Sequence, residues 1–495
     1  MNAATAHAAT AHLPITAELL ARYNIAGPRY TSYPTADRFT SAFGSNDLVQ
    51  ALHARLQTAG AAANTDSSRP LSLYVHIPFC ESLCYFCACN KIITKHHEWA
   101  ADYLQQLQQE LLLYQLHLAH PQTTERPTVS QLHLGGGSPT FLSDDELKQL
   151  MHMLQTFFIF DPQGEYSIEV DPRTVDTQRL RHLKQLGFNR ISFGIQDFDP
   201  AVQQAVHRVQ PVEQVFALMQ AAREAGFTSI NTDLIYGLPH QNADSFTRTL
   251  QQVCALRPDR IALYAYAHLP ERFKAQRRID AHHLPTGNDK IHLLALALQH
   301  FSEAGYVYVG MDHFALPDDE LAQAKKQGTL QRNFQGYSTR PNCDLIGLGI
   351  SAISRIGNCY SQNAKTLDAY GQLLAQGQLP VERGLRLTRD DQIRHAVIMA
   401  IMCQGEVLFD ALQRDWQIDF AAYFAKEIGQ LEQLQTQGLV NMQADRFCVT
   451  PMGWYFVRAV AMVFDHHLQT TRANAHAAGT DAAHIEQPVR FSKIL

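Results

Sequence analysis

The stretch Leu71-Ser-Leu-Tyr-Val-His-Ile-Pro-Phe-Cys80-Glu-Ser-Leu-Cys84-Tyr-Phe-Cys87 joins a strand-like apolar run to three closely spaced cysteines. Thiolates are the usual ligands of iron–sulfur clusters, and a four-iron cluster with three protein ligands leaves one iron open to an external ligand. The C-x3-C-x2-C spacing therefore predicts a [4Fe-4S] cluster on Cys80, Cys84 and Cys87. The alternative is a structural zinc site with Cys89 as fourth ligand, but such sites usually pair two cysteines with a distant Cys or His pair.

The composition excludes several classes of protein. Charged residues make up 18% of the 495 residues and the net charge is −6, which indicates neither a nucleic-acid-binding surface nor a disordered polyelectrolyte. Nine cysteines, five of them dispersed, do not form the dense disulfide framework of a small secreted domain. Residues 1–13 lack the features of a signal peptide, and no apolar run reaches membrane-spanning length. We expect a cytoplasmic protein with no nucleic-acid or membrane partner.

From residue 71 onward, short β-branched or aromatic runs alternate with longer amphipathic ones, the pattern of β-α units with a parallel sheet. Six strands are predicted at residues 71–79, 129–135, 165–171, 190–196, 228–235 and 260–267. Helices are predicted at residues 99–117, 144–158, 176–186, 211–225, 244–256 and 289–304, several of them opened by a Ser or Asp cap. The predicted fold class is α/β, a partial (β/α)6 barrel. An edge strand is expected at 306–313, and the Gly-rich residues 345–354 are expected to return to the open end of the sheet.

Beyond Pro380 the pattern turns helical. Residues 390–402 and 419–435 are periodic in apolar residues, and a stop at Gly438, a hairpin over 439–450 and a helix from Met452 follow. This pattern is typical of a small, mainly helical or winged-helix-like domain, and since it is not basic we expect a lid or packing role. The predicted division is a disordered N-terminus at 1–13, a substrate-gating N-terminal extension at 14–70, the barrel at 71–375, the C-terminal domain at 376–468 and a mostly disordered tail at 469–495.

Strand parity predicts a polar barrel interior. Alternate residues of a strand face opposite ways, and three successive predicted strands each have one apolar face. A closed eight-stranded barrel would pack Val, Ile and Leu on the other face, so we predict a ligand cavity that opens at the same mouth as the cysteine loop. Each polar residue alone is equally well explained as a cap or a buried hydrogen-bonding group. The set comprises Ser167, Glu169, Asp171, Ser192, Gly194, Gln196, Asn231 and Asp233.

The segment Gly135-Gly-Gly-Ser-Pro-Thr140 directly follows the second predicted strand. Glycines there let the backbone approach a ligand, although a triple glycine is commonly only a strand-to-helix turn. Beside a cysteine cluster, we interpret it as a cradle for the amino group of a ligand. Arg208 has the context of a solvated charge at a helix end. The paired histidines are interpreted as surface residues: His96-His97, His282-His283 and His466-His467.

The cysteine loop resembles the signature of radical S-adenosylmethionine (SAM) enzymes, in which the amino and carboxylate groups of the methionine moiety chelate the open iron. From Tyr74-Val-His-Ile-Pro-Phe-Cys80 through Cys87-Ala-Cys-Asn-Lys91, and over nearly the whole chain, the sequence resembles the oxygen-independent coproporphyrinogen III oxidases of haem synthesis. The resemblance implies a radical-SAM barrel. It also rests on Pro28-Arg-Tyr-Thr-Ser-Tyr-Pro34, His133-Leu-Gly-Gly-Gly-Ser-Pro-Thr140, Met311-Asp-His-Phe-Ala315 and Asn333-Phe-Gln-Gly-Tyr337.

The resemblance implies a cluster on Cys80, Cys84 and Cys87 and two molecules of SAM. Cys89 and Tyr74 are predicted to act in catalysis. Ser138 stands where the family pattern has Thr, and Ala88 where it has Gly, and both keep a small side chain. The implied contacts of the first SAM are Tyr74, Gly136, Glu169, Ala267 and Ile353, and those of the second are Phe86, Gly137, Ser138, Gln196, Arg208 and Asp233.

The implied reaction converts the ring A and B propionates of coproporphyrinogen III to vinyl groups, giving protoporphyrinogen IX. An electron from the cluster cleaves SAM, and the 5′-deoxyadenosyl radical removes a β-hydrogen from a propionate, which then loses carbon dioxide and an electron. We expect a monomer that takes electrons from a low-potential donor. A dry shell around the cluster is predicted from Phe79, Tyr85 and Phe86, and the candidates to hold the anionic propionates are Arg29, Lys91, Arg332 and Arg340.

The alternative function is a haem-binding chaperone of the same superfamily, which shares the barrel and the cluster loop but makes no porphyrin. Two features argue against it: the segment at residues 28–34, and Cys89, where such chaperones carry Phe. We predict that residues 28–34 form a rigid segment across the barrel mouth, with aromatic rings that stack on the tetrapyrrole and Arg29 that meets a propionate. A structural zinc protein would explain neither the glycine loop nor the polar interior.

Overall fold

A curved sheet of 12 strands is the centre of the computed structural model, which describes residues 17–23, 25–61, 70–118, 126–340, 343–477 and 491. The strands follow the order β16-β15-β14-β13-β1-β4-β5-β6-β7-β8-β10-β9. The six strands predicted from the sequence lie next to one another and are parallel, which confirms the partial barrel. They are β1 (Leu71–Ile77), β4 (Thr128–Gly136), β5 (Ile159–Val170), β6 (Arg190–Gln196), β7 (Ser229–Tyr236) and β8 (Arg260–Ala265).

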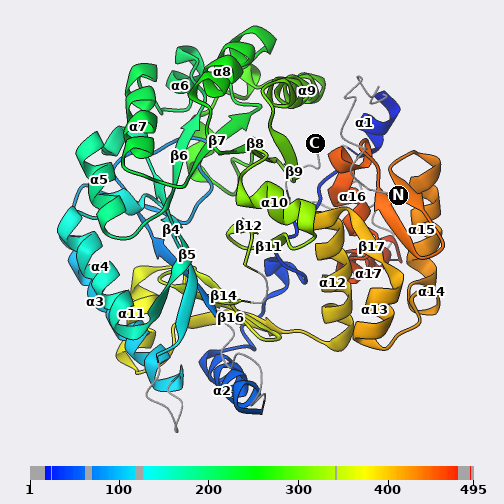
Figure 1. The fold of residues 1–495 in the computed structure, drawn as a ribbon, viewed down its shortest axis with the longest axis horizontal. Helices are drawn as coiled ribbons and strands as arrows, with labels where there is room; N and C mark the ends of the chain where they lie inside the picture. Colours follow the sequence, from blue (N-terminus) through cyan, green and yellow to red (C-terminus); the bar gives the residue numbers. More distant parts are fainter. Residues whose placement is uncertain are drawn as a thin grey trace.

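Helices line the outer side of the curved sheet, as Figure 1 shows. Ser143, Asn242 and Thr286 each close a capping box at a helix start, and this local chemistry made those starts visible in the sequence. The buried face of each helix packs on the apolar face of the strands in the main core. These helices are α3 (Glu98–Leu118), α4 (Asp144–Phe157), α5 (Thr177–Gln185), α7 (Val212–Glu224), α8 (Ala243–Leu256) and α9 (Gly287–Glu303).

The predicted alternation of apolar and polar residues along the strands is confirmed. Ile168, Phe193 and Ile230 are almost completely buried in the main core. Glu169 and Asp233, which have the opposite parity, are only partly buried. The polar side chains therefore line the interior of the barrel, because the helices cover the other face of the sheet.

Both ends of the sheet extend it beyond the six units. The edge strand expected at 306–313 is confirmed over 307–310 but ends early, because Met311 and Asp312 have positive φ angles and turn the chain back. As a result β10 (His313–Ala315) pairs with β8, and β9 (Val307–Gly310) forms the edge, both antiparallel. At the other end the Gly-rich return is confirmed, since β13 (Asp344–Leu348) pairs in parallel with β1. The antiparallel strands β14 (Ile353–Ile356), β15 (Cys359–Asn363) and β16 (Val381–Arg386) then follow.

The C-terminal part combines helices with a three-stranded antiparallel sheet around its own core (Figure 1, right). The predicted hairpin is confirmed, and β17 joins it as a third strand. The helix expected at 419–435 is broken at Phe424, and the helix expected from Met452 begins as the 3-10 turn η7 (Gly453–Phe456). The elements are α12 (Arg389–Gln404), β17 (Glu406–Leu408), α13 (Phe409–Trp416), α14 (Phe420–Tyr423), α15 (Ala425–Thr436), β18 (Val440–Met442), β19 (Arg446–Val449), α16 (Val457–Met462) and α17 (His466–Ala477).

The two tyrosines of residues 28–34 are part of the C-terminal core. Tyr30 and Tyr33 are 1% and 0% exposed, and the Tyr30 hydroxyl donates to Asp465 Oδ2 at 2.9 Å. The expectation that these rings stack on a substrate is therefore wrong, because they are already packed. The segment lies between α1 (Ala17–Tyr23) and α2 (Ser45–Ala61), with the 3-10 turn η2 (Ala36–Arg38) after it.

The predicted tails fall mostly outside the described residues. Residues 1–13 are among those that the structure does not describe. The expectation of disorder from residue 469 is wrong as far as Ala477, where α17 ends. In the described part of the chain, no helix is both long enough and apolar enough to span a membrane.

The remaining elements are short. They are β2 (Phe79–Cys80), β3 (Ile92–Ile93), η3 (Pro139–Phe141), η4 (Pro172–Thr174), α6 (Pro200–Ala205), η5 (Lys274–Arg278), η6 (Ala281–His283), α10 (Glu320–Gln327), β11 (Gln331–Asn333), β12 (Gly336–Ser338) and α11 (Leu367–Ala375). The β11–β12 hairpin lies toward the middle of Figure 1.

Candidate active site

The cysteine loop leaves the carboxyl end of β1 and is held by backbone hydrogen bonds. β2 and β3 pair in parallel at the two ends of the loop, and Thr94 N donates to Cys80 O at 3.0 Å. Within the loop, Cys87 N donates to Cys84 O at 3.3 Å. Tyr85 N donates to Val206 O at 3.0 Å, which ties the loop to the segment after α6. The three cysteines therefore stand at the barrel mouth, as the sequence predicted.

Two arginines face the thiol of Cys84. Arg173 Nη2 and Arg208 Nη1 each donate to Cys84 Sγ at 3.4 Å. Asp171 Oδ2 accepts from Arg173 Nη2 at 2.7 Å and from Arg208 Nη1 at 3.0 Å. Burial alone would raise the pKa of Asp171, but the two guanidiniums outweigh burial and lower it. The two guanidiniums together carry one more charge than Asp171 balances, so the surroundings of the Cys84 sulfur are cationic.

The other cysteines of the loop differ in acidity. A hydrogen bond from Cys89 lowers the pKa of Cys87 to about 6, and the same bond raises the pKa of Cys89. Burial raises the pKa of Cys80 to about 12. Cys89 is exposed and acts as a donor to Cys87, so its position is adjacent to the three predicted ligands.

The donor set fits a cluster better than a single metal ion. Among the described residues, no three His, Cys, Asp or Glu side chains converge closely enough to hold one ion. A zinc ion requires four ligand atoms at about 2.0–2.3 Å, whereas each cysteine of a four-iron cluster binds a different iron and stands further from the others. The residues that surround the loop include Phe79, which is fully buried, and the partly buried Tyr85 and Phe86.

A hydrogen-bonded chain links β1 to the end of the cysteine loop. His76 Nε2 lies 2.9 Å from the carbonyl oxygen of Asn90, so this nitrogen carries the proton and donates. His76 Nδ1 consequently accepts from the Tyr74 hydroxyl at 3.1 Å. Burial lowers the pKa of His76 and raises that of Tyr74, so both side chains stay neutral at pH 7. Tyr74, a predicted SAM contact, therefore also positions the loop.

The glycine loop closes against the cysteine loop. Gly136 has a φ of 112°, and a Cβ atom there would lie 2.7 Å from His76 Nδ1. A Cβ atom at Gly137 would lie 2.6 Å from Pro78 O. Only glycine permits this approach. Gly136 N donates to Glu169 Oε2 at 3.3 Å, and His133 Nε2 donates to Glu169 Oε1 at 3.1 Å.

A cavity of about 240 Å³ opens beside Glu169. Three of the residues predicted for the first SAM, Tyr74, Glu169 and Ile353, line it. Glu169 is 43% exposed, so its carboxylate can accept from a cationic amino group. The residues present therefore fit the amino-acid end of SAM. Ala267 lies two residues beyond β8 and does not line this cavity.

Gln196, Arg208 and Asp233, predicted for the second SAM, lie on or beside neighbouring strands. Arg208 is 7% exposed and donates to Gly194 O at 2.6 Å, so the expectation of a solvated charge is wrong. Asp233 accepts from Ser192 Oγ and from Asn231 Nδ2, both at 3.0 Å. Burial and then the charge of Glu169 raise the pKa of Asp233 to about 6.

Ser138 and Phe86, which are also predicted contacts of the second SAM, lie closer to the cysteines. Ser138 N donates to Phe79 O at 2.9 Å, and the Ser138 hydroxyl lies 3.1 Å from that of Thr140. The carbonyl oxygen of Phe86 accepts from Gln276 Nε2 at 3.0 Å. The set therefore borders both the loop and the barrel interior.

Sequence reasoning missed part of the site. The sequence predicts Asp171 on the polar face but indicates no role for it, and it gives no signal for Arg173. His133 appears in the sequence only as the first residue of the glycine motif. The signal for His133 was its parity, which it shares with Gly135 on β4. Among the paired histidines, His467 is not a plain surface residue, because its Nε2 lies 2.7 Å from Asp391 Oδ1.

Two of the four cations predicted to hold propionates are already engaged elsewhere. Lys91 Nζ donates to Cys87 O at 2.9 Å, so it stabilises the cysteine loop. Arg340 Nε lies 3.6 Å from Glu165 Oε1, near the start of the paired part of β5. Arg29 and Arg332 remain as candidates at the interior.

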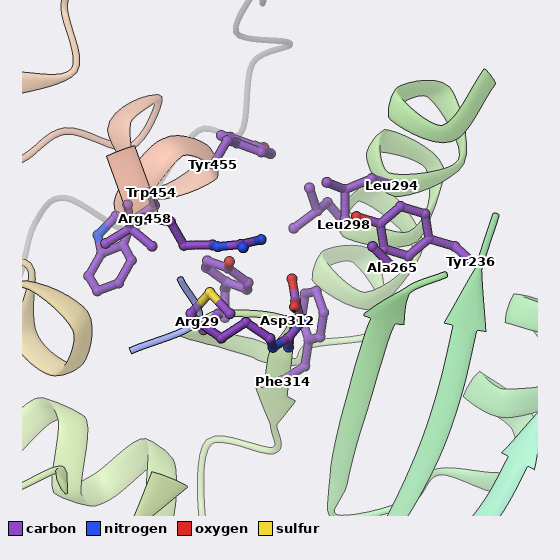
Figure 2. Close-up of a pocket in the computed structure, with 13 residues that line it drawn as sticks. Arg29, Tyr236, Ala265, Leu294, Leu298, Asp312, Phe314, Trp454, Tyr455 and Arg458 are labelled. Carbon is purple, nitrogen blue, oxygen red and sulfur yellow. Dashed lines mark hydrogen bonds and ion pairs between the residues drawn. The ribbon is translucent and has the colours of Figure 1, made fainter. Parts of the chain in front are cut away.

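A second, narrow cavity, of about 30 Å³, lies between the barrel, the N-terminal segment and the C-terminal part (Figure 2). Arg29 Nη2 donates to Asp312 Oδ2 at 2.8 Å, and Arg458 donates to the carbonyl oxygen of Pro28 at 3.0 Å. Figure 2 shows Arg458 above the Arg29–Asp312 pair, with Leu294 and Leu298 on the opposite wall. This cavity combines cationic and apolar walls.

The partial parallel barrel, the three-cysteine loop and the glycine loop against Glu169 define a radical SAM protein. Residues 74–253 match the family described as the Radical SAM superfamily, and residues 387–456 match the HemN C-terminal domain. The chain belongs to the oxygen-independent coproporphyrinogen III oxidases.

Curated relatives support this membership. The chain is 48% identical to the oxygen-independent coproporphyrinogen III oxidase of Pseudomonas aeruginosa, over 91% of this chain and 96% of that protein. It is 46% identical to the Escherichia coli protein of the same name, over 91% and 95%. The solved structure of coproporphyrinogen III oxidase from Escherichia coli, described as a radical SAM enzyme, matches with a TM-score of 0.83 and covers 88% of this chain and 97% of that chain.

Proposed function

We propose that this chain oxidatively decarboxylates the ring A and B propionates of coproporphyrinogen III to vinyl groups, forming protoporphyrinogen IX. The observation that carries the proposal is that the cysteine loop and the acidic cavity share one mouth of the barrel. Arg208 connects them, because it donates both to Cys84 Sγ and to Gly194 O on β6. The relatives named as coproporphyrinogen III oxidases support the choice of substrate over the chaperone alternative.

We assign the cluster to Cys80, Cys84 and Cys87, and the first SAM to the cavity at Glu169. When bound, a [4Fe-4S] cluster and SAM would supply one electron and a carbon radical that abstracts hydrogen. The residues of the chain would bind these groups and exclude water from them. Glu169 accepts from the amino group of the methionine moiety, and Tyr74 and His76 keep the loop in place. The buried ring of Phe79 excludes water from one side of the loop.

We place Cys89 and Tyr74 among the catalytic residues. Cys89 is the exposed thiol nearest in sequence to the predicted ligands, and it keeps its proton and donates a hydrogen bond to Cys87. Tyr74 stacks on His133, with ring centroids 5.9 Å apart, and so faces the same cavity as Glu169. We also propose that the enzyme is a monomer and that a low-potential donor reduces the cluster.

We assign a second SAM to the side of the barrel that carries Gln196, Arg208 and Asp233. Asp233 is the acceptor there, and the raised pKa of its carboxyl group favours a site that a cationic ligand completes. Equilibrium dialysis of the reconstituted protein should give two SAM per chain for the wild type and one for Asp233→Ala. Two per chain in both proteins would refute this assignment.

Anaerobic product analysis tests the function as a whole. The reconstituted protein, a strong reductant, SAM and coproporphyrinogen III should give carbon dioxide and a divinyl porphyrin, detected by fluorescence after chromatography. The Cys84→Ser variant is the matched control and should give neither product. A wild-type protein that binds haem and transfers it, but releases no carbon dioxide, would instead establish the chaperone function.

A further inference from the structure

Arg332 is a buried arginine with no counter-ion among the residues that the structure describes. It is 5% exposed and comes from β11 in the hairpin that lies within the barrel. Among the described residues, neither its Nε nor its Nη1 atom has a hydrogen-bond acceptor, and no carboxylate forms an ion pair with it. These two atoms carry three of the five N–H donors of a guanidinium group.

Other buried arginines of this chain do have partners. Arg208 pairs with Asp171 at 3.0 Å, and Arg394 pairs with Glu427 at 2.8 Å. Arg190 pairs with Glu320 at 2.5 Å. An unpaired buried charge costs several kcal/mol of desolvation, so folded proteins rarely keep one without a function. The missing partner of Arg332 is therefore best sought in a ligand.

The surroundings of Arg332 point to an anionic ligand. Its guanidinium lies 4.6 Å from the ring centroid of Tyr337. The guanidinium of Arg29 lies 5.3 Å from the ring centroid of Tyr264. Burial raises the pKa of the Tyr264 hydroxyl, the charges of Asp233 and Glu169 also raise it, and those of the two arginines lower it. Burial, followed by the charge of Arg332, lowers the pKa of His313 to about 4, so this histidine adds no charge.

Charge is thus divided across the barrel interior. Glu169 and Asp233 form an acidic side that suits a cationic amino group, and Arg332 with Arg29 forms a basic side that suits carboxylates. Arg29 already donates to Asp312 at 2.8 Å, which leaves Arg332 as the stronger anchor. The charges of both sides act on Tyr264.

We propose that Arg332 anchors a carboxylate of the substrate. The inference rests on the proposed function, and the ligand class is a propionate side chain of a tetrapyrrole. Because Nε and Nη1 are closed off from solvent, the substrate reaches them when the turn between β11 and β12 moves. That turn is partly exposed, and Gly336, the first residue of β12, has a φ of 115°. Phe334 and Gln335 of the same turn line the cavity beside Glu169.

The competing explanation is that Arg332 only stabilises the hairpin through the Tyr337 ring. The two explanations predict opposite changes in stability. Removal of an unpaired buried charge should leave the melting temperature of the substrate-free protein unchanged or higher. Removal of a stabilising cation–π contact should lower it. The melting temperatures of Arg332→Gln and Arg332→Lys should therefore be measured with and without substrate.

The test compares Arg332→Gln and Arg332→Lys with Arg446→Gln under anaerobic turnover. Arg446 is a matched control because it is an exposed arginine of the C-terminal part that pairs with Asp445 and Glu406. We expect a KM for coproporphyrinogen III about 10- to 100-fold higher in Arg332→Gln, the loss of a charged hydrogen bond. The KM of Arg332→Lys should lie between those of the wild type and Arg332→Gln, because lysine keeps the charge but not the planar guanidinium group. The control should match the wild type.

Two further readouts separate this inference from the proposed function. Iron content and substrate-independent cleavage of SAM should be unchanged in Arg332→Gln, since the cofactor residues are intact. A wild type that makes no vinyl product would refute the proposed function. A wild type that makes it, together with an unchanged KM in both Arg332 variants, would refute the carboxylate anchor. Loss of iron or of a cooperative melt in Arg332→Lys would refute it as well, because the role would then be structural.

Discussion

Arg208→Met should destabilise the protein by an amount that the contacts of Arg208 allow us to work out. The guanidinium donates to Asp171 Oδ2 at 3.0 Å, to Gly194 O at 2.6 Å and to Cys84 Sγ at 3.4 Å. Methionine keeps similar volume but donates nothing. Breaking a buried ion pair by removing one partner costs about 3–5 kcal/mol.

The loss should fall at the lower end of that range. Arg173 Nη2 still donates to Asp171 Oδ2 at 2.7 Å, so the carboxylate is not left unpaired. The carbonyl oxygen of Gly194 loses its donor, which costs about 1–3 kcal/mol by itself. We therefore expect the free energy of unfolding to fall by about 3 kcal/mol at pH 7.5. The stabilisation from Asp171 is present above its unfolded pKa, about 3.9, and is lost as the pH falls through its lowered folded pKa.

Guanidinium-induced unfolding of the anaerobic apoprotein would measure this loss. The matched control is Arg248→Met, because Arg248 pairs with Asp199 at 3.1 Å but is 63% exposed. An exposed pair contributes about 0–1 kcal/mol, so the control should change little. If both variants lost the same free energy, or if Arg208→Met lost under about 1 kcal/mol, the argument from burial would be wrong.

Three further predictions concern the site. Cys89→Ser should keep its iron and sulfide after reconstitution but turn over poorly, whereas Cys80→Ser should lose the cluster; equal loss in both variants would contradict the three-ligand assignment. Asp233→Ala and Gln196→Ala should retain iron but lose turnover, and normal product formation by both would exclude the second SAM site. His313→Gln should make the protein less sensitive to acid. Burial lowers the pKa of His313 in the folded protein to about 4, so the wild type loses stability as the pH falls below the unfolded pKa of about 6.5. Between pH 7.5 and pH 4.5, urea unfolding should show that the variant loses about 2–3 kcal/mol less free energy of unfolding than the wild type. An identical loss in both proteins would show that His313 does not titrate in this way.

Residues 28–34 were recognised as a motif in the sequence, but the role predicted for their aromatic rings was wrong. The aromatic residues at 28–34 suggested rings that stack on a tetrapyrrole, but Tyr30 and Tyr33 are packed against the C-terminal part. Local sequence shows that a residue is aromatic, but not which distant core buries it. Arg29 alone keeps the predicted orientation toward the interior, through Asp312 and the ring of Tyr264.

Features that depend on neighbours along the chain could be predicted from the amino-acid sequence. The cysteine spacing, the capping residues of the helices, the glycine cradle and the parity of Glu169 and Asp233 are all local or periodic. Their geometry follows from a backbone repeat of two residues in a strand and 3.6 in a helix. These features predicted a cluster on three cysteines and a ligand cavity at the barrel mouth, whereas the class of enzyme and the two molecules of SAM were implied by the resemblance of the motifs to a known family.

The pairing of charges across the fold could not be predicted from the sequence in the same way. Cys84 and Arg208 are 124 residues apart, yet the register of β6 and the segment after α6 brings them within hydrogen-bond distance. The same holds for Arg332: in the described part of the chain no carboxylate pairs with it, and this depends on every element packed around the hairpin. Burial and pairing are properties of the whole packed arrangement, and since the cost of a charge depends on both, no local pattern can specify it.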